Sequence, residues 1–257
     1  MLQSLEIVGN CVPVMRGICI AKKGAGGAQC KTGMAGKPDY TFGIAGSGRM
    51  GTDIFYFLSD HDFPLVWLCV SGSERERQER LFMKKIDRRS AAGALDAPAR
   101  SSLVERTTIT SDIRGLASAD IVIEAITEDE GAKRSFFREL SAVVGREAVM
   151  ATNTSSIRPS LLADPDMGRE RFAGLHFFYP VKLKNIAEII RTDHTSGRSL
   201  DMLKRLLETT GKPFLEMHEN DGFILNRIFL DLQAEAWRCC ERGMAGPRCI
   251  EIGRAHV

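Results

Sequence analysis

The chain has 257 residues, of which 44% are hydrophobic and 26% are charged, as in ordinary folded proteins and unlike disordered ones. Its 35 basic and 33 acidic residues nearly cancel, which argues against nucleic acid or an anionic membrane as a partner and favours a small molecule. The apolar patch at residues 11–21 is interrupted by Arg16 and is too short to cross a bilayer, so no membrane span is predicted.

The two ends of the chain look unlike the rest. Residues 7–38 contain basic residues and a glycine-rich centre but no acidic residue, and we assign no function to an N-terminal extension at 1–38. At the other end, "EIGRAHV" (251–257) follows a helical pattern without a closing element and resembles a translated sequencing adapter. We therefore expect a fragment whose last residues are a cloning or sequencing artefact.

The seven cysteines lack the spacing of a zinc site, and the adjacent Cys239 and Cys240 cannot readily bridge to each other. We predict no metal site and reduced thiols. Reduced thiols indicate a cytoplasmic protein. The mitochondrial matrix is the alternative, because the acid-free N-terminus weakly resembles a targeting extension.

A strand, a glycine-rich turn and a helix are predicted in succession within residues 42–58, "FGIAGSGRMGTDIFYFL". In this GxGxxG pattern, Gly46 permits the tight turn, Gly48 leaves room for a pyrophosphate, and Gly51 lets the helix pack closely on the strand. The pattern alone is weak evidence for a nucleotide site, so the interpretation depends on the elements around it.

Further strands are predicted where apolar runs alternate with helical segments, at residues 64–70, 119–126 and 148–153. This alternation predicts an α/β protein with a Rossmann-type, doubly wound and mostly parallel sheet. Ligands of such sheets bind beyond the carboxyl ends of the strands, where the glycine turn, Glu128 and the polar cluster 153–156 would converge.

Two more strands, predicted at 174–178 and 184–192, carry the candidate chemistry. Period-two alternation puts Glu188 between two isoleucines on one face, where a lone carboxylate is costly, so His176 on the adjacent strand is its candidate partner. An imidazole held by a carboxylate keeps a fixed tautomer and can accept a proton, as a general base must. Two alternatives stay open: His176 is a satisfied core residue, or Glu188 pairs at the rim with a neighbouring basic residue.

From Tyr40 to Gly246 the chain resembles the L-3-hydroxyacyl-CoA dehydrogenase family. The matching stretches are, in order, "GSGRMG", "ADIVIEAITEDEGAKRSFFREL", "ATNTSSI", "RFAGLHFFYPV", "AEII" and "DGFILNRI". The resemblance implies a Rossmann NAD-binding domain with the catalytic His and Glu at 39–218. It also implies a truncated helical C-terminal domain at 219–257, which forms a homodimer in a full-length relative. The implied cofactor is NAD and the implied substrate is an acyl-CoA.

The resemblance also implies residue roles. His176 would take the proton of the substrate's 3-hydroxyl, and Glu188 would orient and support the imidazolium. Ser155 and Asn226 would hydrogen-bond the reacting oxygen or the thioester end. The implied cofactor contacts are Gly46, Gly48, Gly51, Ser71, Glu128, Lys133 and Asn153, with Glu128 and Lys133 near the ribose. Alternatively, Ser155 caps a helix, Asn226 is a surface amide and Lys133 is solvated.

Three positions depart from the family pattern. Ser71 stands where the family usually has the Asp that bonds the adenosine 2′-hydroxyl, and Arg75 or Arg77 could pair with a 2′-phosphate, so NADP is an alternative cofactor. The same charge run could instead be a solvated helix face. Tyr179 replaces the usual Asn and Asp221 the usual Pro, which puts substrate positioning in doubt.

Residues 222–243 are predicted to form one long helix whose apolar stripe stays partly exposed, because no helices follow it. The function implied is hydride transfer from the 3-hydroxyl carbon of an L-3-hydroxyacyl-CoA to NAD, in fatty-acid β-oxidation or butanoate metabolism. One alternative is a related β-hydroxyacid dehydrogenase, a group that "GIAGSGRMG" also resembles but that relies on a lysine. Another is a non-catalytic nucleotide-binding remnant.

Overall fold

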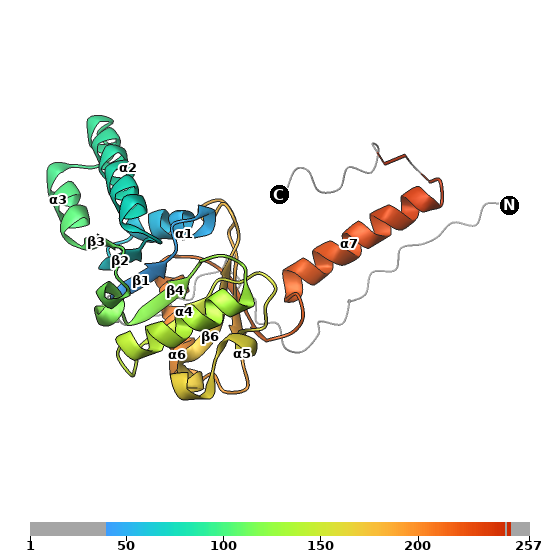
Figure 1. The fold of residues 1–257 in the computed structure, drawn as a ribbon. Helices are drawn as coiled ribbons and strands as arrows, with labels where there is room; N and C mark the ends of the chain where they lie inside the picture. The colour runs from blue at the N-terminus through green and yellow to red at the C-terminus, as the bar shows by residue number, and fades with distance from the viewer. Residues whose placement is uncertain (1–39, 245, 248–257) are drawn as a thin grey trace, which may run out of the picture.

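One eight-stranded sheet, in the order β3-β2-β1-β4-β5-β6-β7-β8, runs through the residues that the computed structural model describes, 40–244 and 246–247 (Figure 1). The strands are β1 (Phe42–Ala45), β2 (Leu65–Leu68), β3 (Thr107–Thr110), β4 (Ile121–Glu124), β5 (Val149–Thr152), β6 (Phe172–Phe177), β7 (Ala187–Arg191) and β8 (Phe214–His218). Neighbouring strands are parallel except β6 and β7. The predicted Rossmann-type sheet is therefore confirmed, while the extension at 1–38 and "EIGRAHV" lie outside the described residues.

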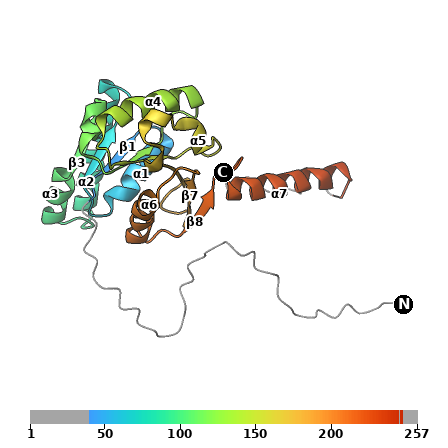
Figure 2. The same ribbon diagram turned by 90° about the horizontal axis from the view of Figure 1, so that it is seen from below.

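Helices cover both faces of this sheet (Figure 2). The helices of the described residues are α1 (Arg49–Ser59), α2 (Gly72–Ala91), α3 (Ala97–Glu105), α4 (Glu130–Val143), α5 (Pro159–Leu162), α6 (Gly197–Thr209) and α7 (Ile224–Glu241), with 3₁₀ turns at Ile113–Ser118, Pro165–Met167 and Arg169–Arg171; α7 does not cover the sheet. On β4, Ile121 and Ile123 pack in the cluster that contains α1 and α6, whereas Val122 packs with α4. Successive side chains of a strand point to opposite faces, so the continuous apolar runs are buried on both sides.

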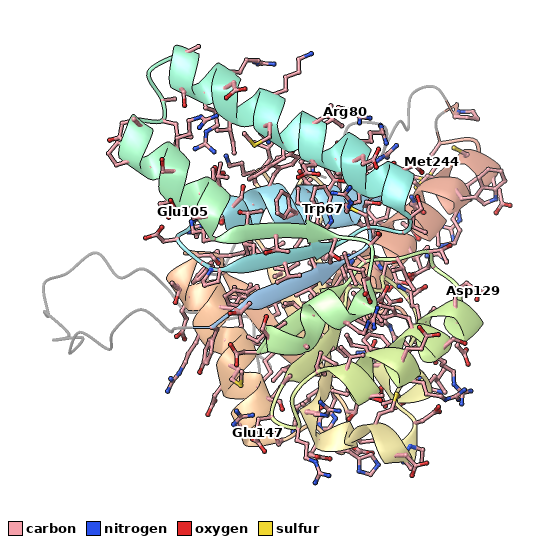
Figure 3. All side chains as sticks on the ribbon, turned by 60° about the vertical axis from the view of Figure 1, so that its left-hand side comes forward. Trp67, Arg80, Glu105, Asp129, Glu147 and Met244 are labelled. Carbon is pink, nitrogen blue, oxygen red and sulfur yellow. The ribbon has the colours of Figure 1, made fainter. Side chains whose placement is uncertain are left out.

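The glycine turn is held from the side of α1 by Trp67 on β2 (Figure 3). The indole Nε1 donates to the carbonyl oxygen of Gly46 at 2.8 Å, and the ring stacks on Phe55 of α1 with a centroid distance of 4.2 Å. A buried indole needs a hydrogen-bond partner, and here that partner is the backbone of the turn itself. The conformation of the turn is thus tied to the packing of the core.

Helix α7 projects away from the sheet domain (Figures 1 and 2). None of its residues is buried, and Ile228, Leu232 and Trp237 are 52%, 52% and 67% exposed. The predicted exposure of the stripe is confirmed, except at Phe223. That residue precedes the helix with φ 54° and is fully buried. Among the described residues, no helix is long and apolar enough to cross a membrane.

Candidate active site

The three glycines of the turn after β1 have different surroundings. Gly46 has φ 112°, and a Cβ on it would lie 2.4 Å from the carbonyl oxygen of Ala125. A Cβ on Gly51 would lie 2.2 Å from the carbonyl oxygen of Gly46, whereas one on Gly48 would meet nothing within 4 Å. Two glycines therefore allow close packing, and the third leaves open space at the start of α1, where no side chain caps the helix.

A cleft of about 880 Å³ lies beside this turn. Its walls include the turn itself, residues 68–70 after β2, residues 111–113 after β3 and residues 125–127 after β4. The structure does not bring Ser71 into this lining. Its hydroxyl instead accepts the backbone N–H of Glu74 at 3.2 Å and caps α2.

The charge run that follows Ser71 is a helix face, as one of the two interpretations predicted. Arg75 pairs with Glu79 at 2.7 Å, and Arg77 pairs with Glu74 at 3.1 Å. Neither arginine lines the cleft beside the glycine turn. Intrahelical pairs of this kind are common on solvated helices and leave the guanidinium groups already partnered.

His176 and Glu188 face each other across the antiparallel pair β6 and β7. The imidazole Nδ1 lies 2.8 Å from Glu188 Oε2, and Glu188 Oε1 accepts the backbone N–H of Leu225 at 3.1 Å. Glu188 is fully buried, so its alternative placement at the rim is wrong. With Nδ1–H held by the carboxylate, the neutral ring keeps Nε2 as its proton acceptor.

A cavity of about 320 Å³ adjoins the imidazole. It is lined by Met50, Ala125, Ile126, Glu128, Lys133, Asn153, Ser155, His176, Phe177, Phe178 and Tyr179. Met50, Ala125 and Ile126 also line the cleft beside the glycine turn, so the two spaces adjoin. Five of the predicted site residues, Glu128, Lys133, Asn153, Ser155 and His176, therefore line one cavity, and Glu188 is hydrogen-bonded to the imidazole of this lining.

Asparagine side chains tie the walls of this cavity together. Asn153 Oδ1 accepts the backbone N–H of Phe177 at 2.8 Å, which joins the end of β5 to β6. Asn226 Nδ2 donates to the carbonyl oxygen of Ser155 at 2.7 Å, so the first turn of α7 reaches the loop after β5. Ser155 caps no helix. Its hydroxyl lies 3.4 Å from Glu128 Oε1.

A chain of charges forms the floor of the cavity. The Lys133 ammonium, 1% exposed, lies 2.5 Å from Glu124 Oε1 and 3.3 Å from Glu128 Oε2. The alternative of a solvated Lys133 is therefore wrong. Burial alone would raise the pKa of Glu128, but hydrogen bonds from Thr154 and Ser155 and the charge of Lys133 bring that pKa below its ordinary value. Glu128 thus stays a carboxylate near neutral pH.

Sequence reasoning missed Glu124 in this chain of charges. It is the last residue of β4 and is fully buried. A glutamate inside the apolar run "IVIEAI", with a lysine nine residues later, was a usable signal, because a buried carboxylate requires a cation or several donors.

A second feature missed from sequence is a basic cleft of about 900 Å³ between α1 and α2. Its lining includes the cations Arg49, Arg77, Lys84, Lys85, Arg88 and Arg89 and one carboxylate, Asp53. Tyr179 lines both this cleft and the cavity at His176, and the Arg49 guanidinium lies 5.5 Å from the centre of its ring. Residues 40–244 and 246–247 contain no cluster of three or more potential metal ligands.

Comparison with known proteins agrees with this geometry. Residues 41–220 match the family described as 3-hydroxyacyl-CoA dehydrogenase, NAD binding domain. A probable 3-hydroxybutyryl-CoA dehydrogenase of Deinococcus radiodurans is 32% identical over 82% of this chain and 75% of its own length. The mitochondrial hydroxyacyl-coenzyme A dehydrogenase of Sus scrofa is 34% identical over 81% of this chain and 68% of its own length.

Solved structures give the same result. The (S)-3-hydroxybutyryl-CoA dehydrogenase of Ralstonia eutropha has a TM-score of 0.74 at 28% identity, covering 84% of this chain and 78% of that one. The 3-hydroxybutyryl-CoA dehydrogenase of Escherichia coli K12 has a TM-score of 0.73 at 31% identity, with 81% of this chain and 44% of that one covered. The chain therefore belongs to the 3-hydroxyacyl-CoA dehydrogenase family of oxidoreductases and carries the NAD-binding domain of that family.

Proposed function

We propose that this chain oxidises L-3-hydroxyacyl-CoA esters to 3-oxoacyl-CoA esters, with NAD as the hydride acceptor. The observation that carries the proposal is the buried His176–Glu188 pair, whose imidazole borders a cavity that adjoins the glycine turn. The names of the relatives support the substrate class.

The residues around the glycine turn fit a dinucleotide. The open space at Gly48 and the uncapped start of α1 suit a pyrophosphate, because unpaired N–H groups at a helix start favour negative charge. The cleft of about 880 Å³ beside the glycine turn would hold the adenosine end of NAD, and we call it the adenosine cleft. Glu128, Lys133 and Asn153 would contact the nicotinamide half. Bound NAD supplies the carbon that accepts the hydride.

His176 acts as the general base in this proposal. Its Nε2 takes the proton of the 3-hydroxyl, and the imidazolium that forms is stabilised by Glu188 at 2.8 Å. In the reducing direction the same nitrogen returns the proton. Ser155 and Asn226, joined by a 2.7 Å hydrogen bond, would orient the reacting oxygen or the thioester beside the imidazole.

The basic cleft supports a coenzyme A ester as the substrate. Its lining has six cations and one carboxylate. Arg77 and Arg89 are paired with Glu74 and Asp60, which leaves Arg49, Lys84, Lys85 and Arg88 as candidates for phosphate groups, which bind through charge-assisted hydrogen bonds. Because Tyr179 lines both spaces, a ligand whose phosphates lie in this cleft could reach His176 past its ring.

A lysine-dependent hydroxyacid dehydrogenase is less well supported. Lys133 lines the cavity, but its ammonium is paired with two carboxylates and cannot serve as a base in that state.

We further propose that residues 39–218 form the NAD-binding domain and that α7 opens a helical second domain, which makes a homodimer in full-length relatives. The unburied apolar stripe of α7 supports this division.

A role in fatty-acid β-oxidation or butanoate metabolism follows from the substrate class. The free thiols of Cys69, Cys239 and Cys240 support a reducing compartment, the cytoplasm or the mitochondrial matrix.

The test is oxidation of (S)-3-hydroxybutyryl-CoA, followed by the absorbance of the reduced nicotinamide. We expect turnover with NAD and a lower kcat/KM with NADP, because Arg75 and Arg77 are paired with glutamates and neither lines the adenosine cleft. Absence of turnover, in the presence of measurable NADH binding, would contradict the proposal and leave the related hydroxyacid dehydrogenase and the non-catalytic alternative.

The glycine turn allows a separate prediction about stability. Gly51→Ala is expected to lower the free energy of unfolding by about 1–3 kcal/mol, since its Cβ must displace the backbone of Gly46. The matched variant Gly48→Ala is expected to change stability by less than about 1 kcal/mol but to weaken NADH binding, because its methyl group fills the space for the pyrophosphate. Urea unfolding and NADH titration check the two; equal stabilities would contradict the packing argument.

A further inference from the structure

Glu124 joins three segments around the cavity without lining it. Its Oε1 accepts the backbone N–H of Ile126 at 2.8 Å and the Lys133 ammonium at 2.5 Å, and its Oε2 accepts the hydroxyl of Thr152 at 2.6 Å. These donors come from the turn after β4, from α4 and from the neighbouring strand β5. A fully buried carboxylate with this many donors is satisfied and held in one orientation.

The Lys133 ammonium donates a hydrogen bond to the Glu124 carboxylate. It has three N–H donors, and among the described residues the structure gives it two carboxylate partners, Glu124 and Glu128. Lys133 also lines the cavity beside His176. The remaining donor is therefore available to a ligand in that cavity.

Glu128 alone would hold the ammonium less firmly. Its side chain is 42% exposed, lies farther from the ammonium, at 3.3 Å, and already accepts the Thr154 hydroxyl at 2.6 Å and the Ser155 N–H at 3.0 Å. Glu124 is closer, fully buried and oriented by Thr152. Of the two carboxylates, Glu124 has the geometry that fixes where the ammonium lies.

We propose that Glu124 is a positioning residue for the cofactor, an inference that rests on the proposed function. It holds the Lys133 ammonium at the floor of the cavity so that the third N–H donates to a hydroxyl of the nicotinamide half of NAD. Glu124 touches neither substrate nor cofactor and acts through Lys133. The adenosine cleft does not include Lys133, and a glutamine at position 124 can still accept the Ile126 N–H of its wall, so the effect falls on one half of the cofactor.

The experiment uses the full chain and two probes: NADH, which spans both spaces, and AMP, which occupies only the adenosine cleft. Glu124→Gln is expected to raise the Kd of NADH by about 10-fold or more, the effect of losing one charge-assisted hydrogen bond, and to leave the Kd of AMP within about 2-fold. Thr152→Val should raise the Kd of NADH by about 3-fold, because it removes the hydrogen bond to only one oxygen of the Glu124 carboxylate. Glu105→Gln, at an exposed glutamate at the end of α3, is the matched control.

A double-variant cycle tests the route through Lys133. If Glu124 acts only through the ammonium, adding Glu124→Gln to Lys133→Met changes the Kd of NADH by less than about 2-fold. If Glu124→Gln weakened the binding of NADH and of AMP equally, the carboxylate would have only a structural role. If Glu124→Gln left NADH binding unchanged, Glu128 alone would suffice to position the Lys133 ammonium. Either result overturns the proposal. Failure of the proposed function is distinguishable, because the unsubstituted chain would then bind NADH without turnover, or bind neither probe.

Discussion

His176→Gln is expected to lower kcat for 3-hydroxybutyryl-CoA oxidation by about 10³-fold, within the range known for loss of a general base. Glutamine fills much of the same space and can still hydrogen-bond Glu188, but its amide cannot take the proton of the 3-hydroxyl. The Kd of NADH should stay within about 2-fold, because glutamine keeps most of the side-chain volume in the cavity and His176 does not line the adenosine cleft. Steady-state kinetics and NADH titration separate the two quantities.

The control for this variant is His218→Gln, which makes the same change on β8 at a half-exposed histidine outside the cavity. It should leave kcat and the free energy of unfolding unchanged. Undiminished turnover in His176→Gln would remove the base assignment and, with it, the proposed mechanism.

Glu188→Gln is expected to reduce kcat by about 10²–10⁴-fold, even though the imidazole remains in place. The amide can donate to Nδ1, which favours the tautomer with its proton on Nε2, where the substrate hydroxyl needs an acceptor. The charge that balances the imidazolium is also lost. The amide oxygen can still accept the Leu225 N–H, so the start of α7 should keep its contact.

Kinetics and circular dichroism together check this second variant. Glu216→Gln, on β8, is its control, because that glutamate forms a partly exposed pair with Lys204 and such pairs contribute little. If Glu188→Gln retained the full kcat with a native spectrum, the carboxylate would have no electrostatic or orienting role.

The fold was predictable where the sequence pattern matches burial on both faces. β4 and β5 are continuous apolar runs, which only a covered parallel sheet accommodates. β3, "TTIT", and β8, "FLEMH", lie at the two edges of the sheet and are only partly buried, so their polar composition resembles that of a loop.

The candidate site was predictable to the extent that strand periodicity determines it. A carboxylate between isoleucines, as at Glu188, requires a hydrogen-bonding or cationic partner. The register of β6 and β7 places His176 opposite it. Contacts that depend on how the helices pack on the sheet could not be predicted from strand periodicity. Lys133 resembles any solvated helix residue until α4 is packed against the end of β4, and the basic cleft exists only once α1 and α2 lie side by side.

The junction of α7 with the sheet domain is made beside the His176–Glu188 pair. In the first turn of the helix, the backbone N–H of Leu225 donates to Glu188, and the side chain of Asn226 donates to the loop that lines the cavity. Beyond that first turn it projects without buried residues. A tilt of the helix axis would act on the imidazole through this shared hydrogen-bond acceptor and through the buried Phe223, whose ring centre lies 5.7 Å from that of the imidazole. The direction of the α7 axis and the orientation of the His176 imidazole are therefore coupled.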